Sequence, residues 1–288
     1  MSAQRRLRLA AILNPAAGSD GKQLVATLAS SEAAEVHVIT TTAAGDAADI
    51  AYKLAAEAEP VDVAVSVGGD GTVFEVATGL WRAREAGVTA VPPLLVAPGG
   101  TGNSVYRGLW NDASWSSVVD CVSRERSRTR AVDLARIEQN GHIVVLGSGS
   151  GLFAQTLVKA AELPGSGRQL LMDAALAAMA ECTPYEGRVV VDGEVVHEGG
   201  IIETITGGFR YRGGLLNLVP GSVLDDGLLD ITVVTADADM NAFAHAALGG
   251  NVHDVPGIRW GRGEHVAVER SDGQPLLFEH DGEVMPRA

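Results

Sequence analysis

The sequence predicts an α/β chain in two parts, a doubly wound and mostly parallel sheet followed by a mainly antiparallel β-sandwich. Over about the first 125 residues, apolar runs that suit strands buried on both faces alternate with segments of helical periodicity. Beyond them the apolar segments are short and punctuated by Asp-Gly turns, as in antiparallel sheets. A length of 288 residues fits two domains. We expect an α/β domain over residues 1–128 and a β-rich domain over 129–288.

Four strands and three helices are expected in the first domain. The strands cover residues 7–13, 36–40, 61–67 and 94–97. Helices follow the first three strands and are marked by apolar residues at helical spacing: Leu24, Val25 and Leu28, then Ile50 and Leu54, then Val73, Val76 and Leu80. Asn14 or Ser19 is expected to cap the first of these helices. Carboxyl ends of parallel strands share one edge, so Asn14, Thr41 and the turns at 68–72 and 99–103 should converge there.

The second domain is expected to be built from short strands. These cover residues 131–137, 142–146, 188–191, 201–206 and 229–234, with one helical insertion over 169–179. Asp-Gly turns lie at 192–193, 226–227, 272–273 and 281–282. Four arginines at alternate positions from 124 to 130 would share one face of a strand. That row indicates a solvated strand face, with contact to phospholipid as the alternative.

One stretch, residues 65–76, indicates a nucleotide site. An apolar strand runs into Gly68-Gly69-Asp70-Gly71-Thr72, and the turn opens a helix. Backbone N–H groups at a helix N-terminus attract phosphate, and glycines let a ligand approach the main chain. Asp70 would repel a phosphate unless a metal ion lay between them, so the pattern favours a Mg-nucleotide. A plain glycine turn is the competing interpretation, which the three turns at one sheet edge weigh against.

Composition excludes several classes of protein. The formal net charge of −14 argues against nucleic acid as a partner and against bulk electrostatic adhesion to anionic membranes. Cys121 and Cys182 lack the spacing of a zinc site and suit a reducing compartment. No signal peptide is evident, and the apolar stretch 170–180 is too short to span a bilayer. We expect a cytoplasmic protein, with peripheral membrane contact left open.

Several motifs occur in one order along nearly the whole chain. They are the Asn-Pro-Ala-Ala-Gly run at 14–18, Gly-Gly-Asp-Gly-Thr at 68–72, Pro-Gly-Gly-Thr-Gly-Asn at 98–103, Tyr-Arg-Gly-Gly at 211–214, Asp-Asp-Gly-Leu-Leu-Asp at 225–230 and Asp-Gly-Glu at 281–283. In this set the chain resembles the diacylglycerol kinase catalytic-domain family, which includes bacterial lipid kinases and, more remotely, sphingosine and ceramide kinases. The glycine turn alone also resembles NAD kinases and phosphofructokinases.

The resemblance implies an ATP-dependent lipid kinase that uses ATP and Mg²⁺. By position, the nucleotide-binding residues would be Asn14, Thr41, Gly68, Gly69, Asp70, Gly71, Thr72, Glu75, Gly100, Thr101 and Asn103. The family's general base falls on Glu283, with Asp281 beside it, and Asp70 would help to organise Mg²⁺ and phosphate. A structural Mg²⁺ would be held by the Asp226 carboxylate and by the carbonyls of Val223 and Leu228. From the residues alone, the Asp226 turn fits metal binding and a plain hairpin turn equally well, whereas the Asp-Gly-Glu run at 281–283 is a plain turn whose catalytic role rests on the resemblance.

Three departures from the family pattern stand out. Phe74 occupies a position that is commonly Asn, Ser104 follows Asn103 where many relatives carry Asp, and the chain ends at Ala288 soon after Glu283. These departures motivate one alternative, a non-catalytic nucleotide-binding regulator. A kinase of a soluble metabolite, similar to NAD kinase, is the other alternative.

The phosphoryl acceptor is expected to be a diacylglycerol-like or sphingoid-like alcohol, because the family acts on lipids. Apolar side chains surround the helical insertion: Leu152, Phe153, Leu157, Val158, Leu163, Leu170, Leu171, Met172, Leu176 and Met179. Ordinary core is the expected role for most of them, and a pocket for acyl chains is the alternative. We expect transient contact with a membrane surface, and a homodimer is left open.

Overall fold

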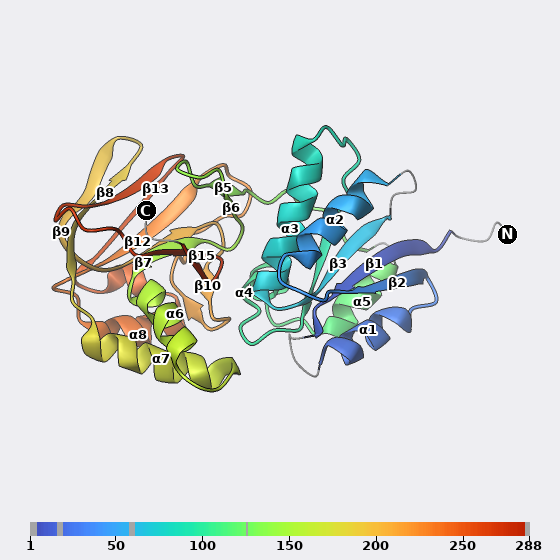
Figure 1. Cartoon of the computed structure of the whole chain (residues 1–288), viewed down its shortest axis with the longest axis horizontal. Helices are drawn as coiled ribbons and strands as arrows, with labels where there is room; N and C mark the ends of the chain where they lie inside the picture. Colours follow the sequence, from blue (N-terminus) through green and yellow to red (C-terminus); the bar gives the residue numbers. More distant parts are fainter. Residues whose placement is uncertain (1–4, 16–19, 58–60, 125, 286–288) are drawn as a thin grey trace. The chain divides into compact units, whose positions relative to one another are not determined.

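The computed structural model describes residues 5–15, 20–57, 61–124 and 126–285. The chain divides into two compact units, Met1–Arg130 and Ala131–Ala288, which are coloured blue to cyan and green to red in Figure 1. The first unit holds a parallel sheet and the second a mostly antiparallel one, so the predicted fold class is confirmed.

The first unit is a four-stranded sheet in the order β2-β1-β3-β4, with every pair parallel. Its strands are β1 (Leu7–Leu13), β2 (Ala34–Thr40), β3 (Val63–Gly68) and β4 (Leu94–Pro98). Its helices are α1 (Gly21–Ala29), α2 (Asp46–Ala56), α3 (Asp70–Glu85), α4 (Ser104–Trp110) and α5 (Trp115–Ser123). The predicted strands and the three predicted helices are all present.

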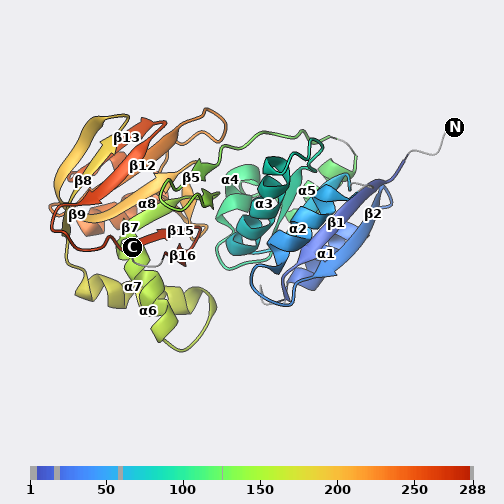
Figure 2. The same cartoon turned by 45° about the horizontal axis from the view of Figure 1, so that its top comes forward.

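Helices cover both faces of this sheet (Figure 2). On one face, α2 and α3 bury Ala51 and Val76 against Ala10 and Ile12 of β1. On the other face α1 starts against Leu13, and the Trp115 indole of α5 donates a hydrogen bond to the Leu24 carbonyl of α1 (2.9 Å). Because both faces are covered, β1, β3 and β4 are mostly apolar, whereas the edge strand β2 is largely exposed and carries Glu35 and His37.

The second unit is organised around one eight-stranded sheet whose pairings are all antiparallel. The strands of this sheet are β7 (Ser148–Gly151), β8 (Tyr185–Val191), β9 (Glu194–Gly207), β12 (Leu229–Thr235), β13 (Ile258–Gly263), β14 (Val266–Arg270), β15 (Phe278–His280) and β16 (Glu283–Val284). Strand β9 pairs with β7, β8 and β12, so it is the centre of the sheet.

Two short hairpins and three helices complete this unit within its described residues. The hairpins pair β5 (Ala135–Arg136) with β6 (Ile143–Val144), and β10 (Tyr211–Arg212) with β11 (Leu216–Asn217). The helices are α6 (Leu152–Glu162), α7 (Gly167–Glu181) and α8 (Met240–Gly249), and a 3₁₀ turn follows at Val252–Asp254. Helices α6 and α7 pack side by side in Figures 1 and 2.

Several local predictions for the second unit are wrong. The strands expected over 131–137 and 142–146 shrink to two residues each, partly because the N–H groups of Val145 and Leu146 bond to the Asp281 carboxylate instead of to a ladder. The helical insertion predicted over 169–179 is present as α7, but it is one of three helices. Helices α6 and α8 also form, because each carries apolar residues at helical spacing that pack against the unit. The arginine row does not form a strand: Arg124 ends α5 and pairs with Asp120, and no strand covers 126–130.

The expected cap of α1 is also wrong for Asn14. The helix begins after Asp20, and Ser19 lies outside the described residues. The Asn14 side chain donates instead to the hydroxyl oxygen of Thr72 (3.1 Å). A residue at the end of β1 thus contacts the glycine turn after β3, which bears on the site below.

Candidate functional site

In the first unit the carboxyl ends of the strands gather the predicted nucleotide residues at one sheet edge. Parallel pairing brings the ends of β1, β2 and β3 together, and the Thr41 N–H donates to the Leu13 carbonyl (2.9 Å) just beyond them. The Asn14–Thr72 hydrogen bond joins the end of β1 to the start of α3. The predicted convergence of these strand ends is therefore present.

The two glycine turns contact each other directly. A Cβ added to Gly100 would lie 2.2 Å from the Gly69 Cα, and the Gly99 N–H donates to the Gly68 carbonyl (2.9 Å). Within the second turn, Asn103 and Gly100 exchange two hydrogen bonds of 2.8 Å, and Asn103 takes a left-handed φ of 56°. Glycine at position 100 is thus required by backbone packing.

Asp70 links these turns. Its Oδ2 accepts the Ser104 N–H (2.9 Å) and its Oδ1 accepts the Val105 N–H (3.0 Å), both at the first turn of α4. A carboxylate is stabilised at a helix N-terminus, where N–H groups lack intrahelical partners. The acid that would repel a phosphate therefore holds a neighbouring helix in place. Ser104, the residue that departs from the family pattern, is buried and takes part in this contact through its backbone N–H.

Glu75 has a similar role one turn further along α3. Its two carboxylate oxygens accept the N–H groups of Gly45 (3.0 Å) and Ala47 (3.1 Å) at the start of α2. Phe74 beside it is half-buried, and Thr101 is exposed on the second turn. Glu75 thus fixes the loop that follows β2 against α3.

The start of α3 presents backbone N–H groups that precede its helical hydrogen bonds. The first N–H with a helical partner is that of Val73, to the Gly69 carbonyl (3.1 Å), so the N–H groups of Asp70, Gly71 and Thr72 precede the helical ladder. Gly71 is exposed, and a Cβ added there would meet no atom within 4 Å. N–H groups without helical partners at a helix N-terminus attract phosphate, and the open space beside Gly71 leaves the backbone there accessible.

In the second unit, Asp281 and Gly282 form a two-residue hairpin turn between β15 and β16. Both take left-handed φ angles, 51° and 85°, as a type I′ turn requires. Buried Asp281 accepts N–H groups from Val145 (3.1 Å) and Leu146 (2.6 Å), and its own N–H donates to the Gly147 carbonyl (2.9 Å). Asp281 is therefore a structural anchor of the turn.

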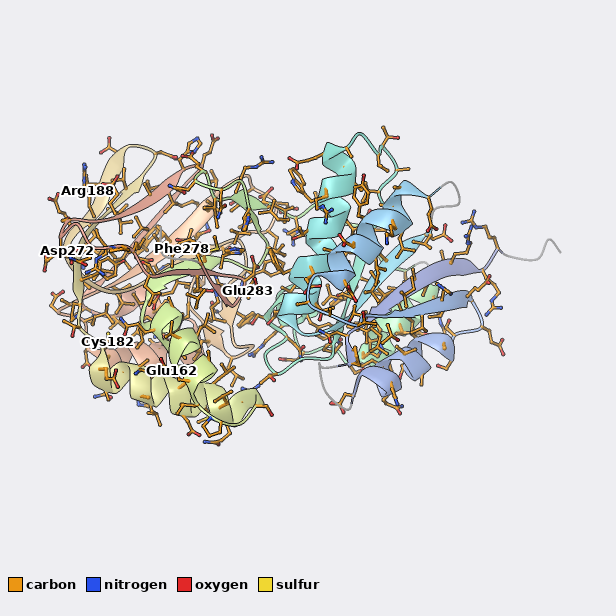
Figure 3. All side chains as sticks on the ribbon, viewed as in Figure 1. Glu162, Cys182, Arg188, Asp272, Phe278 and Glu283 are labelled. Atoms are coloured by element: carbon orange, nitrogen blue, oxygen red, sulfur yellow. The ribbon has the colours of Figure 1, made fainter. Side chains whose placement is uncertain are left out.

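Glu283 is exposed and pairs with His280 across the hairpin. Figure 3 labels it together with Phe278 of the neighbouring strand β15. The hairpin register fixes the position of Glu283 on β16. On the opposite strand, buried His280 contacts Asp281 Oδ2 through Nδ1 (3.2 Å). An exposed carboxylate on a rigid turn can accept a proton from a bound hydroxyl.

The predicted metal turn lies between β11 and β12. Asp226 Oδ1 accepts the Leu228 N–H (3.1 Å), and its Oδ2 is 4.0 Å from Nη1 of Arg262, which also pairs with buried Asp230. Asp133 supports the same turn by accepting the Gly227 N–H (2.7 Å). Among the described residues no three His, Cys, Asp or Glu side chains cluster as a metal site.

Sequence reasoning missed a buried polar group behind the Asp281 turn, made of Glu203, Arg212 and Glu279. Burial raises the pKa of Glu279 to about 7, and burial with the nearby Glu279 charge raises that of Glu203 well above its usual range. The signal in the sequence was a lone acid in an apolar strand, at Glu203, and an acid two residues before Asp281. Neither belongs to a motif, so neither was singled out.

Both parts of the chain match models of known protein families. The family model for the diacylglycerol kinase catalytic domain matches residues 8–137, and that for the YegS C-terminal NAD kinase beta sandwich-like domain matches residues 144–288. The chain belongs to the diacylglycerol kinase catalytic-domain family. The family that the motifs predict is therefore confirmed. This family carries a lipid-kinase-like catalytic domain that uses ATP.

Relatives of this diacylglycerol kinase family member span most of its length. The chain is 27% identical over 265 residues to a protein named "Probable lipid kinase YegS-like" of Enterobacter sp. (strain 638), covering 88% of this chain and 84% of that protein. A Xanthomonas campestris pv. campestris (strain 8004) protein of the same name is 27% identical over 81% of this chain and 75% of its own. A diacylglycerol kinase crystal structure from Bacillus anthracis str. Sterne shares the fold, with a TM-score of 0.68, 22% identity and coverage of 99% of this chain and 92% of that one.

The structure also bears on the expected membrane contact. In the described ranges, no helix is long and apolar enough to cross a bilayer. Five of the apolar residues expected mostly as core are exposed: Leu163, Leu171, Met172, Leu176 and Met179. The core interpretation is wrong for these five, because α7 buries only the small side chains Ala174 and Ala178 on its inner face.

Proposed function

We propose that the chain transfers the γ-phosphoryl group of Mg-ATP to the hydroxyl of a lipid alcohol, diacylglycerol-like or sphingoid-like. The observation that carries this proposal is the pair of interlocked glycine turns at the strand-end edge, with open space at Gly71 over the N-terminus of α3. Membership of a kinase family that acts on lipids supports the rest.

For the nucleotide, we assign phosphate binding to the N–H groups of Gly71 and Thr72. The helix dipole and these donors favour the negative charge of the phosphates. Asn14, Thr41, Glu75 and the turn at 100–103 hold the surrounding loops in place, through the hydrogen bonds described above. Asp70 orders the second turn by holding α4, and its carboxylate would help to hold a Mg²⁺ ion that offsets the charge of the phosphates.

For the proton, we assign general-base catalysis to Glu283 and positioning of its turn to Asp281. A lipid hydroxyl is a weak nucleophile, so a carboxylate that accepts its proton during phosphoryl transfer accelerates the reaction. The Asp281 carboxylate is occupied by two backbone N–H groups and is buried, so it supports the turn without touching the acceptor.

Mg²⁺ would offset the charge on the transferring phosphates. A second, structural ion fits the Asp226 turn by donor chemistry, since the Asp226 carboxylate and the Val223 and Leu228 carbonyls offer only oxygen, as Mg²⁺ prefers. Arg262 near Asp226 Oδ2 already supplies positive charge there, so we expect binding of that ion to be weak.

For the acceptor, the exposed apolar face of α7 supports contact with a lipid surface. Leu176 is 66% exposed, Met172 54% and Met179 47% on this helix. Apolar side chains of this kind insert at the boundary between headgroups and acyl chains, and they need no attraction between a chain of net charge −14 and anionic lipid.

The test is a transfer assay with purified chain, Mg-ATP and a panel of acceptors. Diacylglycerol and sphingoid alcohols in mixed micelles should be phosphorylated, while NAD and other soluble alcohols should not. Glu283→Gln should abolish transfer, and Glu264→Gln, an exposed glutamate after β13, should not. Transfer to NAD instead would favour the soluble-metabolite kinase. Nucleotide binding by calorimetry without turnover on any acceptor would favour the non-catalytic regulator.

A further inference from the structure

Two buried carboxyl groups lie behind the Asp281–Glu283 turn and take no part in the proposed chemistry. Glu203 on β9 is 1% exposed, and its Oε2 accepts the Phe153 N–H (2.5 Å) at the first turn of α6. Glu279 on β15 is 6% exposed, and its Oε2 accepts the Gly282 N–H (3.2 Å). Glu279 therefore contacts the residue that precedes Glu283.

The two carboxyl groups face the same glycine. A Cβ added to Gly149 on β7 would lie 2.9 Å from Glu203 Oε1, 3.4 Å from Glu279 Oε1 and 2.5 Å from the Thr204 carbonyl oxygen. Only a residue without a side chain leaves room for both acids at this point. Among the described atoms Glu203 Oε1 has no hydrogen-bond partner, which is costly for an ionised carboxylate.

The charges around the pair determine which acid is ionised. Arg212 on β10 is buried and donates to the carbonyls of Thr206, Phe209 and Tyr211, so its own charge needs a nearby anion. Burial raises the pKa of Glu279 to about 7, and the Asp281 charge also raises it. Arg212, the Gly282 N–H and His280 lower this pKa and so partly oppose burial.

Glu203 has the opposite surroundings. Burial and the Glu279 charge raise its pKa well above the usual range, against the Phe153 N–H and the more distant Arg212. The other titratable groups near it, the Tyr185 hydroxyl of β8 and the Cys182 thiol, are neutral, since burial raises the pKa of both. Of the two carboxyl groups, Glu279 therefore ionises more readily.

We propose that Glu279 is a positioning residue for Glu283: its ionised carboxylate holds the Gly282 N–H and so fixes the hairpin that presents Glu283. The inference rests on the proposed function of Glu283 as general base. The hairpin needs such support, because β16 is only two residues long.

The physical reason lies in the strength of the hydrogen bond. An ionised acceptor forms a bond roughly twice as strong as a neutral one. When Glu279 is protonated, the Gly282 N–H is held less firmly while Asp281 still anchors the other side of the turn. The population of hairpins with Glu283 correctly placed should therefore rise as Glu279 ionises.

The direct test follows the Gly282 amide by NMR as a function of pH in the full chain. We expect its chemical shift to titrate with a midpoint near pH 7 in the wild type. Glu203→Gln should keep this titration, because the Gly282 N–H donates to Glu279 and not to Glu203, and Glu279→Gln should abolish it. A Gly282 amide that does not titrate between about pH 5.5 and about pH 8.5 would overturn the proposal, and the wild-type measurement decides this even if Glu279→Gln does not fold.

The second readout is the pH profile of lipid phosphorylation. In the wild type kcat should rise by up to about tenfold from about pH 6 to about pH 8, as a single group with this midpoint ionises. Glu279→Gln should remain at the low-pH rate with an unchanged KM for ATP, and Glu203→Gln should keep the rise. A Glu279→Gln profile that still rises overturns the positioning role. An amide that titrates in a chain that transfers no phosphate supports the held turn and counts against the proposed function alone.

Discussion

Asp70→Asn alters a side chain that joins the first glycine turn to the helix after the second. In the structure both carboxylate oxygens of Asp70 accept an N–H of α4, at 2.9 Å from Ser104 N and 3.0 Å from Val105 N. Asparagine keeps one acceptor oxygen and places an amide NH₂ where the other oxygen was. One charge-assisted hydrogen bond is lost, and two donors then face each other.

The expected cost follows from these contacts. A hydrogen bond to a charged group contributes about 1.5–3 kcal/mol, and the interaction of a carboxylate with a helix N-terminus adds about 0.3–1 kcal/mol. We therefore expect Asp70→Asn to lower the free energy of unfolding of the first unit by about 2–4 kcal/mol. Nucleotide affinity should fall as well, because the turn at 100–103 is no longer held against α3.

The assay is equilibrium unfolding in urea, followed by the fluorescence of Trp81, Trp110 and Trp115. These lie in the first unit, and a Trp260→Phe background removes the exposed tryptophan of the second. Asp49→Asn is the matched control, because Asp49 forms only an exposed ion pair with Arg82 and should leave the unfolding midpoint unchanged. If Asp70→Asn unfolds at the same urea concentration as the wild type, the carboxylate does not tie the turns together.

Three further predictions concern other parts of the chain. Because the pKa of Glu279 is about 7 when folded against 4.5 when unfolded, the folded chain binds the proton more tightly, so the free energy of unfolding should fall by about 3 kcal/mol as pH rises through that window. Glu279→Gln should remove that fall in pH-dependent urea titrations, and a fall that persists would contradict the assignment. Gly71→Ala should leave the free energy of unfolding unchanged but lower nucleotide affinity about tenfold, as measured by calorimetry. Gly100→Ala should destabilise the fold by about 1–3 kcal/mol, since its Cβ meets the Gly69 backbone. Equal effects of the two changes would count against an open phosphate site at Gly71. Leu176→Ser should weaken sedimentation with lipid vesicles without loss of stability, while Leu248→Ser on α8, equally exposed at 64%, should not.

The first unit was predictable from the sequence because each strand there is a local signal. The run Leu7–Leu13 is apolar at every position except Arg8, ends at a proline-containing turn, and appears as β1 with the same bounds. Parallel pairing then follows from the alternation with helices, and it brings Asn14 and Thr41 to the edge where the glycine turns lie. The prediction needed no long-range information beyond the rule that parallel strands share an edge.

The second unit was harder to predict because its contacts are distant in sequence. Val145 and Leu146 look like strand residues, yet their N–H groups are bound by Asp281, more than a hundred positions later. Glu203 looks like a surface acid in a strand, but β9 lies at the sheet centre with neighbours on both edges and α6 over its end. Neither the burial of an acid nor its partner can be read from the strand that carries it.

Phosphorylation of a lipid hydroxyl by this chain can be measured directly. The most direct measurement incubates the purified chain with Mg²⁺, ATP radiolabelled at the γ-phosphate and a total lipid extract, and then separates organic and aqueous phases. We expect label in an organic-phase product. This label should depend on Mg²⁺ and should be absent with Glu283→Gln. Wild-type protein that binds ATP but leaves all label in the aqueous phase would contradict it.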